Sequence, residues 1–256
     1  MSPRPVHPIV VIPARMASTR LPNKPLADIG GVPMIVHVWR RAMEAALGPV
    51  VVACAEAVIA EAVQRAGGQA VLTRPDHPSG TDRVHEAVER IDPQGAHDIV
   101  LNVQGDLPTL EPRLIRVLAG LFDDVQVDMA TLAARVDPQE LTIPSVVKVS
   151  VTDPSFEALG RASARIFVRQ PPAGDASQFY HHIGLYGFRR AVLRRFVALP
   201  PSASELSERL EQLRALDNGM RIQVAFVDTV PLGVDTPADL ARARAMLAPG
   251  HPSPQH

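Results

Sequence analysis

The sequence predicts an α/β fold, doubly wound around a mostly parallel sheet. Short apolar runs of the kind that form buried strands alternate with longer stretches whose apolar residues recur at helical spacing. Polar loops rich in proline and glycine separate these segments. Strand, helix, strand, helix, strand in this order is typical of parallel strands joined by right-handed crossovers.

The first strand is predicted at Ile9–Ile12, and Pro13 should end its ladder because proline has no amide hydrogen. After a turn at Gly30-Gly31, Pro33 suits the first turn of a helix that runs to about Leu47. Further elements then alternate up to residue 91: strands at 49–53 and 69–72, and helices at 56–66 and 82–91.

The second half begins with the strongest strand pattern in the chain, 98–103. Its other predicted elements are a helix at 111–121, β-type segments at 128–133 and 146–151, a helix from Ser204, a strand at 221–227 and a helix at Pro237 capped by Thr236 or Asp235. Lys148 alternates with apolar neighbours, so we expect it on the wet face of its strand. Glu208 and Glu211 are expected to share one face of the helix from Ser204.

Composition limits the class of protein. Hydrophobic residues make up 46% of the chain, and 26 Lys and Arg nearly balance 27 Asp and Glu. We expect no nucleic-acid or membrane partner, because no global field would attract one. No signal peptide is visible, and no stretch reaches the roughly 18 apolar residues of a membrane span. Cys54, the one cysteine, is interpreted as a buried apolar residue and fits a cytoplasmic location.

We expect a single domain over residues 1–256. The weakly patterned region 137–179 is too long for a simple crossover, which favours a projecting β element. Residues 1–7 and 249–256 are rich in proline and are expected to be loose ends.

A cationic loop follows the first strand. It carries Arg15, Arg20 and Lys24 with the hydroxyls of Ser18 and Thr19 between them, and prolines restrict it. Ligands of open α/β sheets bind at the carboxyl ends of the strands, so an anion is expected here. Phosphate suits both arginine forks and a lysine. The alternative is a solvated loop without a ligand.

The order of these residues, Pro-Ala-Arg-x-x-Ser-Thr-Arg-Leu-Pro-x-Lys-Pro from Pro13 to Pro25, resembles the signature of the sugar nucleotidylyltransferases. This form looks like that of the cytidylyltransferases that activate 3-deoxy-manno-octulosonate (Kdo). Four further motifs follow in the family order, so the resemblance covers about Ile9 to Leu247. It implies a nucleotide-diphospho-sugar transferase (Rossmann-like) fold. It also implies transfer of CMP from CTP to the anomeric hydroxyl of Kdo, giving CMP-Kdo and diphosphate for lipopolysaccharide biosynthesis.

The resemblance implies a nucleotide site built from three segments. Arg15 and Lys24 would be catalytic cations that hold the triphosphate, and the segment 77–83 would lie against the cytosine base. A plain loop and helix cap is the alternative for 77–83. The implied nucleotide-binding residues are Pro13, Ala14, Arg15, Ser18, Lys24, Pro78, Ser79, Gly80, Arg83 and Gln104.

Two aspartates are the candidate metal ligands. Asp106 follows a strand in Asn-Val-Gln-Gly-Asp, where α/β phosphoryl-transfer proteins place a metal-binding Asp. Asp235 stands in Gly-Val-Asp-Thr-Pro and alone would be a helix cap. The resemblance implies that both are catalytic and bind Mg²⁺. Many relatives have Glu where this chain has Leu107, and leucine can neither bind metal nor move protons.

The resemblance also implies a sugar site. Arg169 matches the family's substrate-binding arginine, with Arg165 as its competitor. His182 and Tyr186 are four apart on an extended segment and share a face, although two interior polar residues would look the same. The implied substrate-binding residues are Gln104, Arg169, His182, Tyr186, Glu211 and Gln212.

Two alternative functions remain open. The chain could be a cytidylyltransferase for a related 2-keto sugar acid, of the 8-amino-Kdo or sialic acid type, or a catalytically silent nucleotide-binding protein. In the family, the region matching about 137–190 binds sugar and meets a two-fold mate. The resemblance therefore implies a homodimer with CTP and Kdo as its small-molecule partners.

Overall fold

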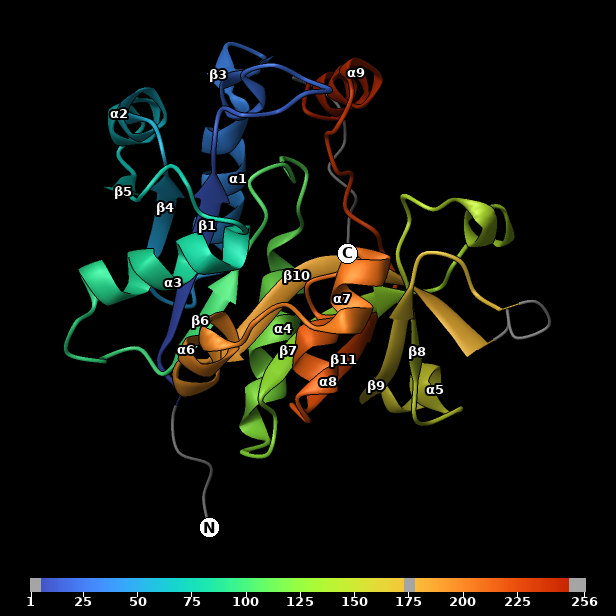
Figure 1. Ribbon diagram of the computed structural model, residues 1–256. Helices are drawn as coiled ribbons and strands as arrows, with labels where there is room; N and C mark the ends of the chain where they lie inside the picture. Colours follow the sequence, from blue (N-terminus) through green and yellow to red (C-terminus); the bar gives the residue numbers. More distant parts are fainter. Residues whose placement is uncertain (1–5, 173–177, 249–256) are drawn as a thin grey trace. The chain divides into compact units, whose positions relative to one another are not determined.

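The computed structural model describes residues 6–172 and 178–248 and divides them into two compact units (Figure 1). The N-terminal unit holds residues 9–94, 102–113 and the chain from 231 onward, and the central unit holds residues 95–101 and 114–230 with the chain before Ile9. The predicted loose ends lie outside the described residues except for Val6 and His7. A single domain over 1–256 stays a prediction.

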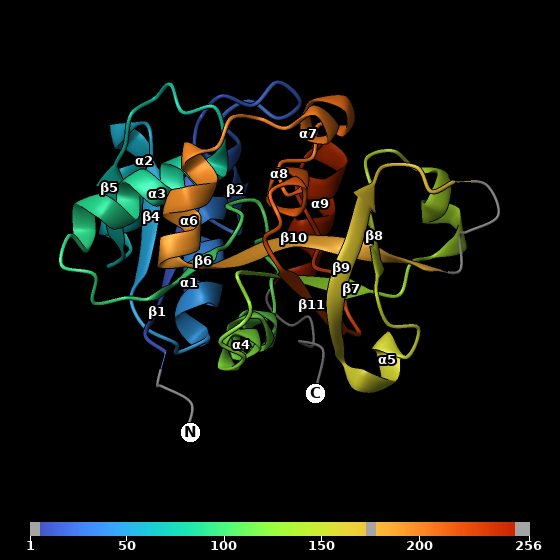
Figure 2. The ribbon, with the colours of Figure 1, turned by 60° about the horizontal axis from the view of Figure 1, so that its bottom comes forward.

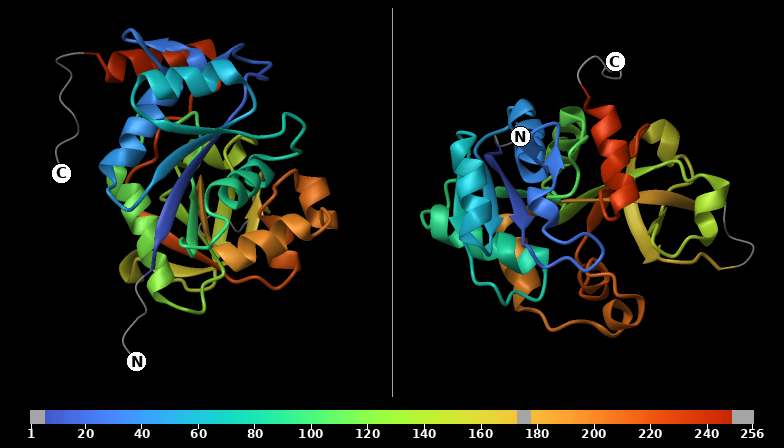
Figure 3. Two further views of the ribbon diagram at one scale, coloured as in Figure 1. Left: turned by 90° about the vertical axis from the view of Figure 1, so that its left-hand side faces the viewer. Right: turned by 90° about the horizontal axis from the view of Figure 1, so that it is seen from above.

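Parallel strands form the centre of the N-terminal unit. β1 (Pro8–Ala14) pairs with β4 (Val50–Cys54), and β4 pairs with β5 (Gln69–Leu72), both in parallel. All five residues of β4 are buried, including the free Cys54. α1 (Met34–Glu44) and α3 (Gly80–Ile91) lie on opposite sides of β1 and β4 in the left view of Figure 3, and α2 (Ala57–Arg65) lies along β5. The predicted parallel pairing is confirmed for these strands.

Pro13 does not end the first strand, so that part of the prediction is wrong. β1 continues to Ala14, with Pro13 opposite Ala53. Successive amides of a strand point to alternate sides, and Val10 donates its N–H toward the β4 side, to Pro49 O. The nitrogen of Pro13 therefore faces away from β4, and the ladder between β1 and β4 loses no hydrogen bond.

Short elements connect this sheet to the ends of the unit. η1 (Lys24–Leu26) precedes a small hairpin of β2 (Asp28–Ile29) and β3 (Val32–Pro33). Gly30 and Gly31 both have positive φ, 63° and 81°, which confirms the predicted turn. α9 (Pro237–Met246) begins after the N-cap Thr236, whose capping box with Asp239 confirms the predicted cap.

The described residues of the central unit form six strands, five of which close into a ring. Its strands are β6 (Ile99–Asn102), β7 (Met129–Ala134), β8 (Lys148–Val151), β9 (Arg161–Val168), β10 (Phe179–Arg189) and β11 (Ile222–Val227). β7 and β11 run parallel, whereas β10 is antiparallel to β7 and β8, and β9 is antiparallel to β8 and β11. Because β8 pairs with both β9 and β10, the order β10-β7-β11-β9-β8 closes on itself. The predicted mostly parallel sheet thus describes the N-terminal unit and not this one.

Helices cover the central strands. They are α4 (Pro112–Gly120), η2 (Leu121–Asp123), η3 (Pro138–Thr142), α5 (Phe156–Leu159), α6 (Arg190–Ala198), α7 (Ala203–Glu208) and α8 (Leu213–Asp217). Figure 2 shows α5 beside β8 and β9. Within residues 6–172 and 178–248, no helix combines the length and the apolar character that a membrane crossing requires.

The helix predicted from Ser204 is two helices. Arg209 adopts a left-handed conformation with φ of 55°, and this ends α7 at Glu208. Glu211 lies in the turn before α8. Glu208 and Glu211 therefore do not share a helical face, contrary to the prediction.

Lys148 is fully buried, so its predicted place on a wet face is wrong. β8 is paired on both sides, and the Lys148 Nζ donates at 2.8 Å to both Ile143 O and Arg169 O. These carbonyls take the place of water around the ammonium. Burial nevertheless lowers the pKa of Lys148.

We expect Gly187→Ala to destabilise the central unit. A Cβ at Gly187 would lie 2.5 Å from a ring carbon of the buried Phe122 and 3.2 Å from Leu101 Cδ2. Overpacking of this kind typically costs about 1–3 kcal/mol, which urea unfolding would detect as a lower midpoint. Gly184→Ala is the matched control, because nothing lies within 4 Å of its Cβ position. Equal losses in the two variants would contradict the packing argument.

Candidate active site

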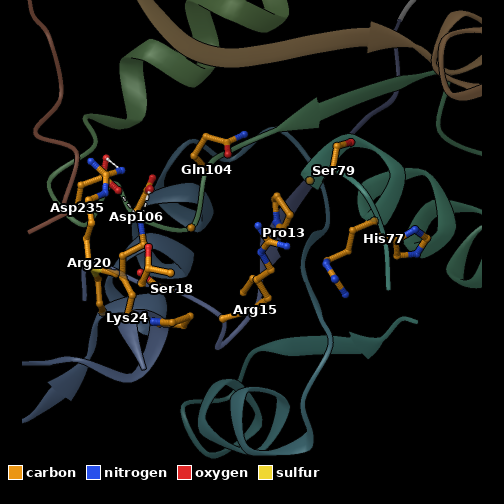
Figure 4. A pocket seen from close by; sticks show the side chains of 18 residues that line it. Pro13, Arg15, Ser18, Arg20, Lys24, His77, Ser79, Gln104, Asp106 and Asp235 are labelled. Atoms are coloured by element: carbon orange, nitrogen blue, oxygen red, sulfur yellow. Dashed lines mark hydrogen bonds and ion pairs between the residues drawn. The ribbon is translucent and has the colours of Figure 1, made fainter. Parts of the chain in front are cut away.

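A cavity of about 420 Å³ in the N-terminal unit brings the predicted motifs together (Figure 4). Lys24, Asp106 and Asp235 lie at one end and His77 and Ser79 at the other. The predicted residues that line it are Pro13, Ala14, Arg15, Ser18, Lys24, Ser79, Gly80, Arg83, Gln104, Asp106 and Asp235. Pro78 is exposed and does not line it. Four segments far apart in the sequence thus form one concave, strongly charged surface.

Lys24 is placed by the local geometry of the cationic loop. Asn23 takes a left-handed conformation with φ of 56°, which asparagine tolerates better than most residues. η1 then begins at Lys24, and the buried Pro25 anchors it. The Lys24 Nζ lies 2.7 Å from Asp106 Oδ2 and 2.9 Å from Asp235 Oδ1. One ammonium therefore bridges the two predicted metal ligands.

Asp106 is placed by the glycine before it. A Cβ at Gly105 would lie 2.8 Å from Pro13 O and 3.2 Å from Ile35 Cδ1, so only glycine allows the chain to pass this close to β1. The backbone of Asp106 is also held, because its carbonyl accepts a hydrogen bond from Val234 N at 2.9 Å. These contacts fix the start of the turn that carries the carboxylate.

Asp235 stands immediately before the N-cap of α9. Its amide donates to Asp239 Oδ2 at 3.3 Å, within the network that caps this helix. Its carboxylate points into the cavity, where Arg20 Nη2 lies 3.0 Å from Oδ2. Thr236, and not Asp235, therefore caps the helix, and a role of Asp235 as a metal ligand stays a prediction.

The charge balance around Lys24 favours its ammonium form. Burial lowers the pKa of Lys24, but the charges and hydrogen bonds of Asp106 and Asp235 raise it, and the net pKa lies above its ordinary value. A raised lysine pKa stabilises the folded state below that pKa and loses this effect as the pH rises through it. The bridge is therefore complete at neutral pH.

Several further lining residues were not among the predicted nucleotide, sugar or metal ligands, although Thr19 and Arg20 belong to the predicted anion-binding loop. They are Ala17, Thr19, Arg20, Pro25, Met34, His77 and Gly105. His77 is 7% exposed, and its Nε2 contacts the Glu86 carboxylate. The feature of the sequence that points to His77 as a lining residue is its place in the polar segment 77–83. Leu107 is buried, and a Cβ added at Gly233 would lie 3.9 Å from its side chain. Leu107 therefore packs beside Gly233.

Arg83 lines the cavity, but its guanidinium group forms hydrogen bonds with other residues of the chain. It is 2% exposed, and Nη1 donates to Thr73 Oγ1 at 2.6 Å and to Arg74 O at 3.0 Å. It therefore holds the segment that follows β5. Ser79 caps α3 by accepting from Asp82 N at 3.1 Å, in agreement with the helix cap expected within segment 77–83.

Apart from Gln104, which lines the cavity, the predicted sugar residues lie in the central unit. The rings of His182 and Tyr186 are 5.6 Å apart, so the two side chains are neighbours, and their contact with a sugar stays a prediction. A β-bulge between Ile183 and Tyr186 makes room for the buried Thr131, whose Oγ1 lies 2.9 Å from His182 Nε2. Burial raises the pKa of Tyr186, and the nearby charge of Glu211 raises it further.

The remaining predicted sugar residues differ in their partners. Gln212 is 4% exposed, and its Nε2 has no hydrogen-bond partner among the described residues. Arg169 donates from Nε to Glu208 O at 2.8 Å, from Nη1 to Pro144 O at 3.0 Å and from Nη2 to Arg209 O at 3.1 Å. Its competitor Arg165 is exposed.

The donor set for a metal ion is small. Within the part of the chain that the structure describes, no group of three or more His, Cys, Asp and Glu gathers. The adjacent histidines have different partners, Glu140 for His181 and Thr131 for His182, as expected for opposite faces of a strand. Asp106 and Asp235 therefore remain the candidate ligands, with phosphate oxygens and water to complete a shell.

We expect His182 to stay neutral far into the acid range. Burial, with a smaller effect of His181, lowers the pKa of His182 to about 3. The unfolded chain takes up this proton near pH 6.5, so the folded state loses roughly 1.4 kcal/mol per pH unit between these values as the pH falls. NMR of the imidazole resonances, assigned with His182→Gln, tests this prediction. Protonation of the folded protein near pH 6 would contradict it.

Comparison with known proteins gives consistent matches. Residues 9–222 match the family model described as cytidylyltransferase. The chain is 61% identical over 243 residues to the 3-deoxy-manno-octulosonate cytidylyltransferase of Parvibaculum lavamentivorans, covering 94% of this chain and 93% of that one. It is 58% identical over 241 residues to the protein of the same name from Paramagnetospirillum magneticum, covering 94% and 97%.

Solved structures agree with these matches. CMP:2-keto-3-deoxy-manno-octonic acid synthetase, in complex with CTP, aligns with a TM-score of 0.85 at 40% identity, covering 94% of this chain and 98% of that one. 4-diphosphocytidyl-2C-methyl-D-erythritol synthase of Anaerococcus prevotii aligns with a TM-score of 0.63 at 12% identity, covering 94% and 98%, which shows a shared fold alone. The chain therefore belongs to the cytidylyltransferase family, among the 3-deoxy-manno-octulosonate cytidylyltransferases.

Proposed function

We propose that this chain transfers CMP from CTP to the anomeric hydroxyl of Kdo, giving CMP-Kdo and diphosphate for lipopolysaccharide biosynthesis. The observation that carries the proposal is the bridge of Lys24 between Asp106 and Asp235, in a cavity lined by the family's triphosphate loop. Relatives at 58–61% identity bear the name of this activity.

The reaction requires no nucleophile from the protein. The anomeric oxygen of Kdo attacks the α-phosphorus of CTP, the bond to the bridging oxygen of diphosphate breaks, and the hydroxyl proton is released. Arg15 and Lys24 neutralise the triphosphate and orient it for in-line attack. Arg20 lines the same cavity and adds a third cation. Positioning and charge neutralisation therefore carry the catalysis.

Mg²⁺ is the proposed cofactor, held by Asp106 and Asp235. The two carboxylates fit it, because Mg²⁺ is typically bound by one or two carboxylates together with substrate phosphates and water. Their side chains are 30% and 46% exposed, so both are reachable from the cavity. When bound, the ion neutralises charge at the phosphorus and favours ionisation of the sugar hydroxyl.

Arg169 is the proposed ligand of the Kdo carboxylate. Its guanidinium has five N–H groups, and three of its nitrogens donate to backbone carbonyls, so N–H groups on Nη1 and Nη2 remain for a ligand. His182, Tyr186, Glu211, Gln212 and Gln104 are the proposed contacts of the sugar hydroxyls. Segment 77–83 is proposed to read cytosine.

The proposal includes a doubly wound, Rossmann-like architecture, a cytoplasmic location and a homodimer formed through the β-rich region of 137–190. A buried, reduced Cys54 is compatible with a reducing compartment. For the dimer, the support is a set of exposed apolar side chains in that region: Ile143, Leu159 and Ile166, at 42%, 58% and 42% exposure.

A substrate panel tests the proposed activity. Diphosphate release is measured with CTP or UTP and with Kdo, 8-amino-Kdo or a sialic acid, in the presence of Mg²⁺. We expect the highest kcat/KM for CTP with Kdo. Faster turnover of another sugar acid would make that acid the substrate in place of Kdo. If no pair is turned over, the chain would be a nucleotide-binding protein without this activity.

We expect strict dependence on a divalent cation. Asp106→Asn and Asp235→Asn should each lose orders of magnitude in turnover, because each removes a ligand charge opposite a substrate with four negative charges. Circular dichroism should show that both variants fold. Asp28→Asn removes an exposed carboxylate of the same unit and is the control. Full activity of the wild-type chain in excess chelator would refute the requirement.

Arg169→Ala should raise the KM for Kdo and leave the KM for CTP nearly unchanged. If the ion pair with the Kdo carboxylate is well desolvated, the loss in kcat/KM is on the order of 2–5 kcal/mol. Arg165→Ala is the control and should do much less, since Arg165 is exposed. The reverse order of the two variants would make Arg165 the carboxylate ligand.

Light scattering at micromolar concentration should give the mass of a dimer of this 27.6 kDa chain. Apolar side chains that are exposed in one chain become buried in a two-fold contact, which favours association. Ile166→Glu should shift the mass toward the monomer, whereas Val125→Glu, at a 70% exposed position outside 137–190, should not. A monomeric mass for the wild-type chain would contradict the proposed dimer.

A further inference from the structure

The cations of the triphosphate loop already occupy the carboxylates of the proposed metal site. Lys24 Nζ contacts Asp106 Oδ2 and Asp235 Oδ1, and Arg20 Nη2 contacts Asp235 Oδ2. Both aspartates thus have a cationic partner that belongs to the chain itself. Lys24 is the more enclosed cation, with its side chain 17% exposed against 62% for Arg20.

This arrangement conflicts with simultaneous metal binding. Mg²⁺ binds oxygen at roughly 2.0–2.1 Å, so an ion held by both carboxylates would lie close to an ammonium that contacts one oxygen of each. Two like charges so close repel strongly in a partly buried site. Lys24 and the divalent ion therefore compete for the same pair of carboxylates.

The triphosphate supplies the force that resolves this competition. It brings several anionic oxygens to the loop of Arg15 and Lys24, and a lysine on a flexible four-carbon stem can follow them. Once the ammonium contacts phosphate, the carboxylate oxygens become free and the local potential favours a divalent ion. Arg20 pairs with one carboxylate only and is mostly exposed, so its effect on the metal is smaller.

We propose that Lys24 is a place-holding cation: it occupies the Asp106–Asp235 pair until a triphosphate draws it away, so that the divalent ion binds with the nucleotide and not before it. This inference rests on the proposed function, because it takes the two aspartates as metal ligands. It gives Lys24 a second role beside its contact with phosphate, and it sets the order in which the site fills.

Binding of Mn²⁺ alone, followed by the electron paramagnetic resonance signal of the free ion, tests the order without any turnover. For the wild-type chain, we expect Mn²⁺ affinity to be at least about tenfold weaker without CTP than with it. Lys24→Met should bind Mn²⁺ without CTP at least about tenfold more tightly than the wild type, because the competing charge is gone. Arg20→Met is the matched control and should change this affinity by less than about threefold.

Further variants locate the effect and guard against misfolding. Lys24→Met/Asp106→Asn should lose the gained affinity, which would assign the gained site to this carboxylate pair. Lys24→Gln keeps a hydrogen-bond donor without the charge, and it replaces Lys24→Met if circular dichroism shows that the methionine variant is unfolded.

The possible outcomes distinguish the place-holding role of Lys24 from the metal site of the proposed function. If the wild-type chain binds Mn²⁺ with CTP and a folded Lys24 variant gains no affinity without it, the place-holding role is wrong and the metal site stands. Equal Mn²⁺ affinity of the wild type with and without CTP also overturns the place-holding role. If Mn²⁺ binds to no variant, even with CTP, the metal part of the proposed function fails and this inference fails with it.

Discussion

The bridge from Lys24 to Asp106 and Asp235 is the interaction on which the site depends. It joins one residue of the triphosphate loop to residues 82 and 211 positions away, and so brings together the ends of three segments. Each partner is positioned by a local feature of the chain. These features are the left-handed conformation of Asn23 before Lys24, Gly105 before Asp106 and the N-cap Thr236 after Asp235. Without an opposite charge between them, the two carboxylates would repel each other in a partly buried cavity.

The central unit provides a different environment from that charged cavity. Its strand β10 carries titratable groups that burial keeps neutral, such as His182 and Tyr186. Neutral donors and acceptors suit the hydroxyl groups of a sugar, and the unbonded Nε2 of Gln212 offers one more donor. Under the proposed function, phosphate charge and sugar hydroxyl groups would be bound by different sets of residues.

Much of the fold and of the site can be predicted from the sequence, because interactions between residues close together in the sequence decide it. Strand periodicity, the Gly30-Gly31 turn and the caps at Ser79 and Thr236 depend on near neighbours, and all were confirmed. The motif order also identified eleven lining residues of the cavity. The predictions that were wrong concern residues whose environment depends on partners far away in the sequence. Lys148 is buried because β9 and β10 flank β8, and Pro13 continues its strand because its nitrogen faces away from the β4 ladder.

A crystal structure of the chain with CTP and Mn²⁺ tests the central claim most directly, because the anomalous signal of manganese locates the ion. The account predicts a manganese peak in contact with the carboxylates of Asp106 and Asp235, with the Lys24 ammonium moved onto the triphosphate. A manganese ion bound elsewhere, with Lys24 still between the two aspartates beside bound CTP, would contradict it.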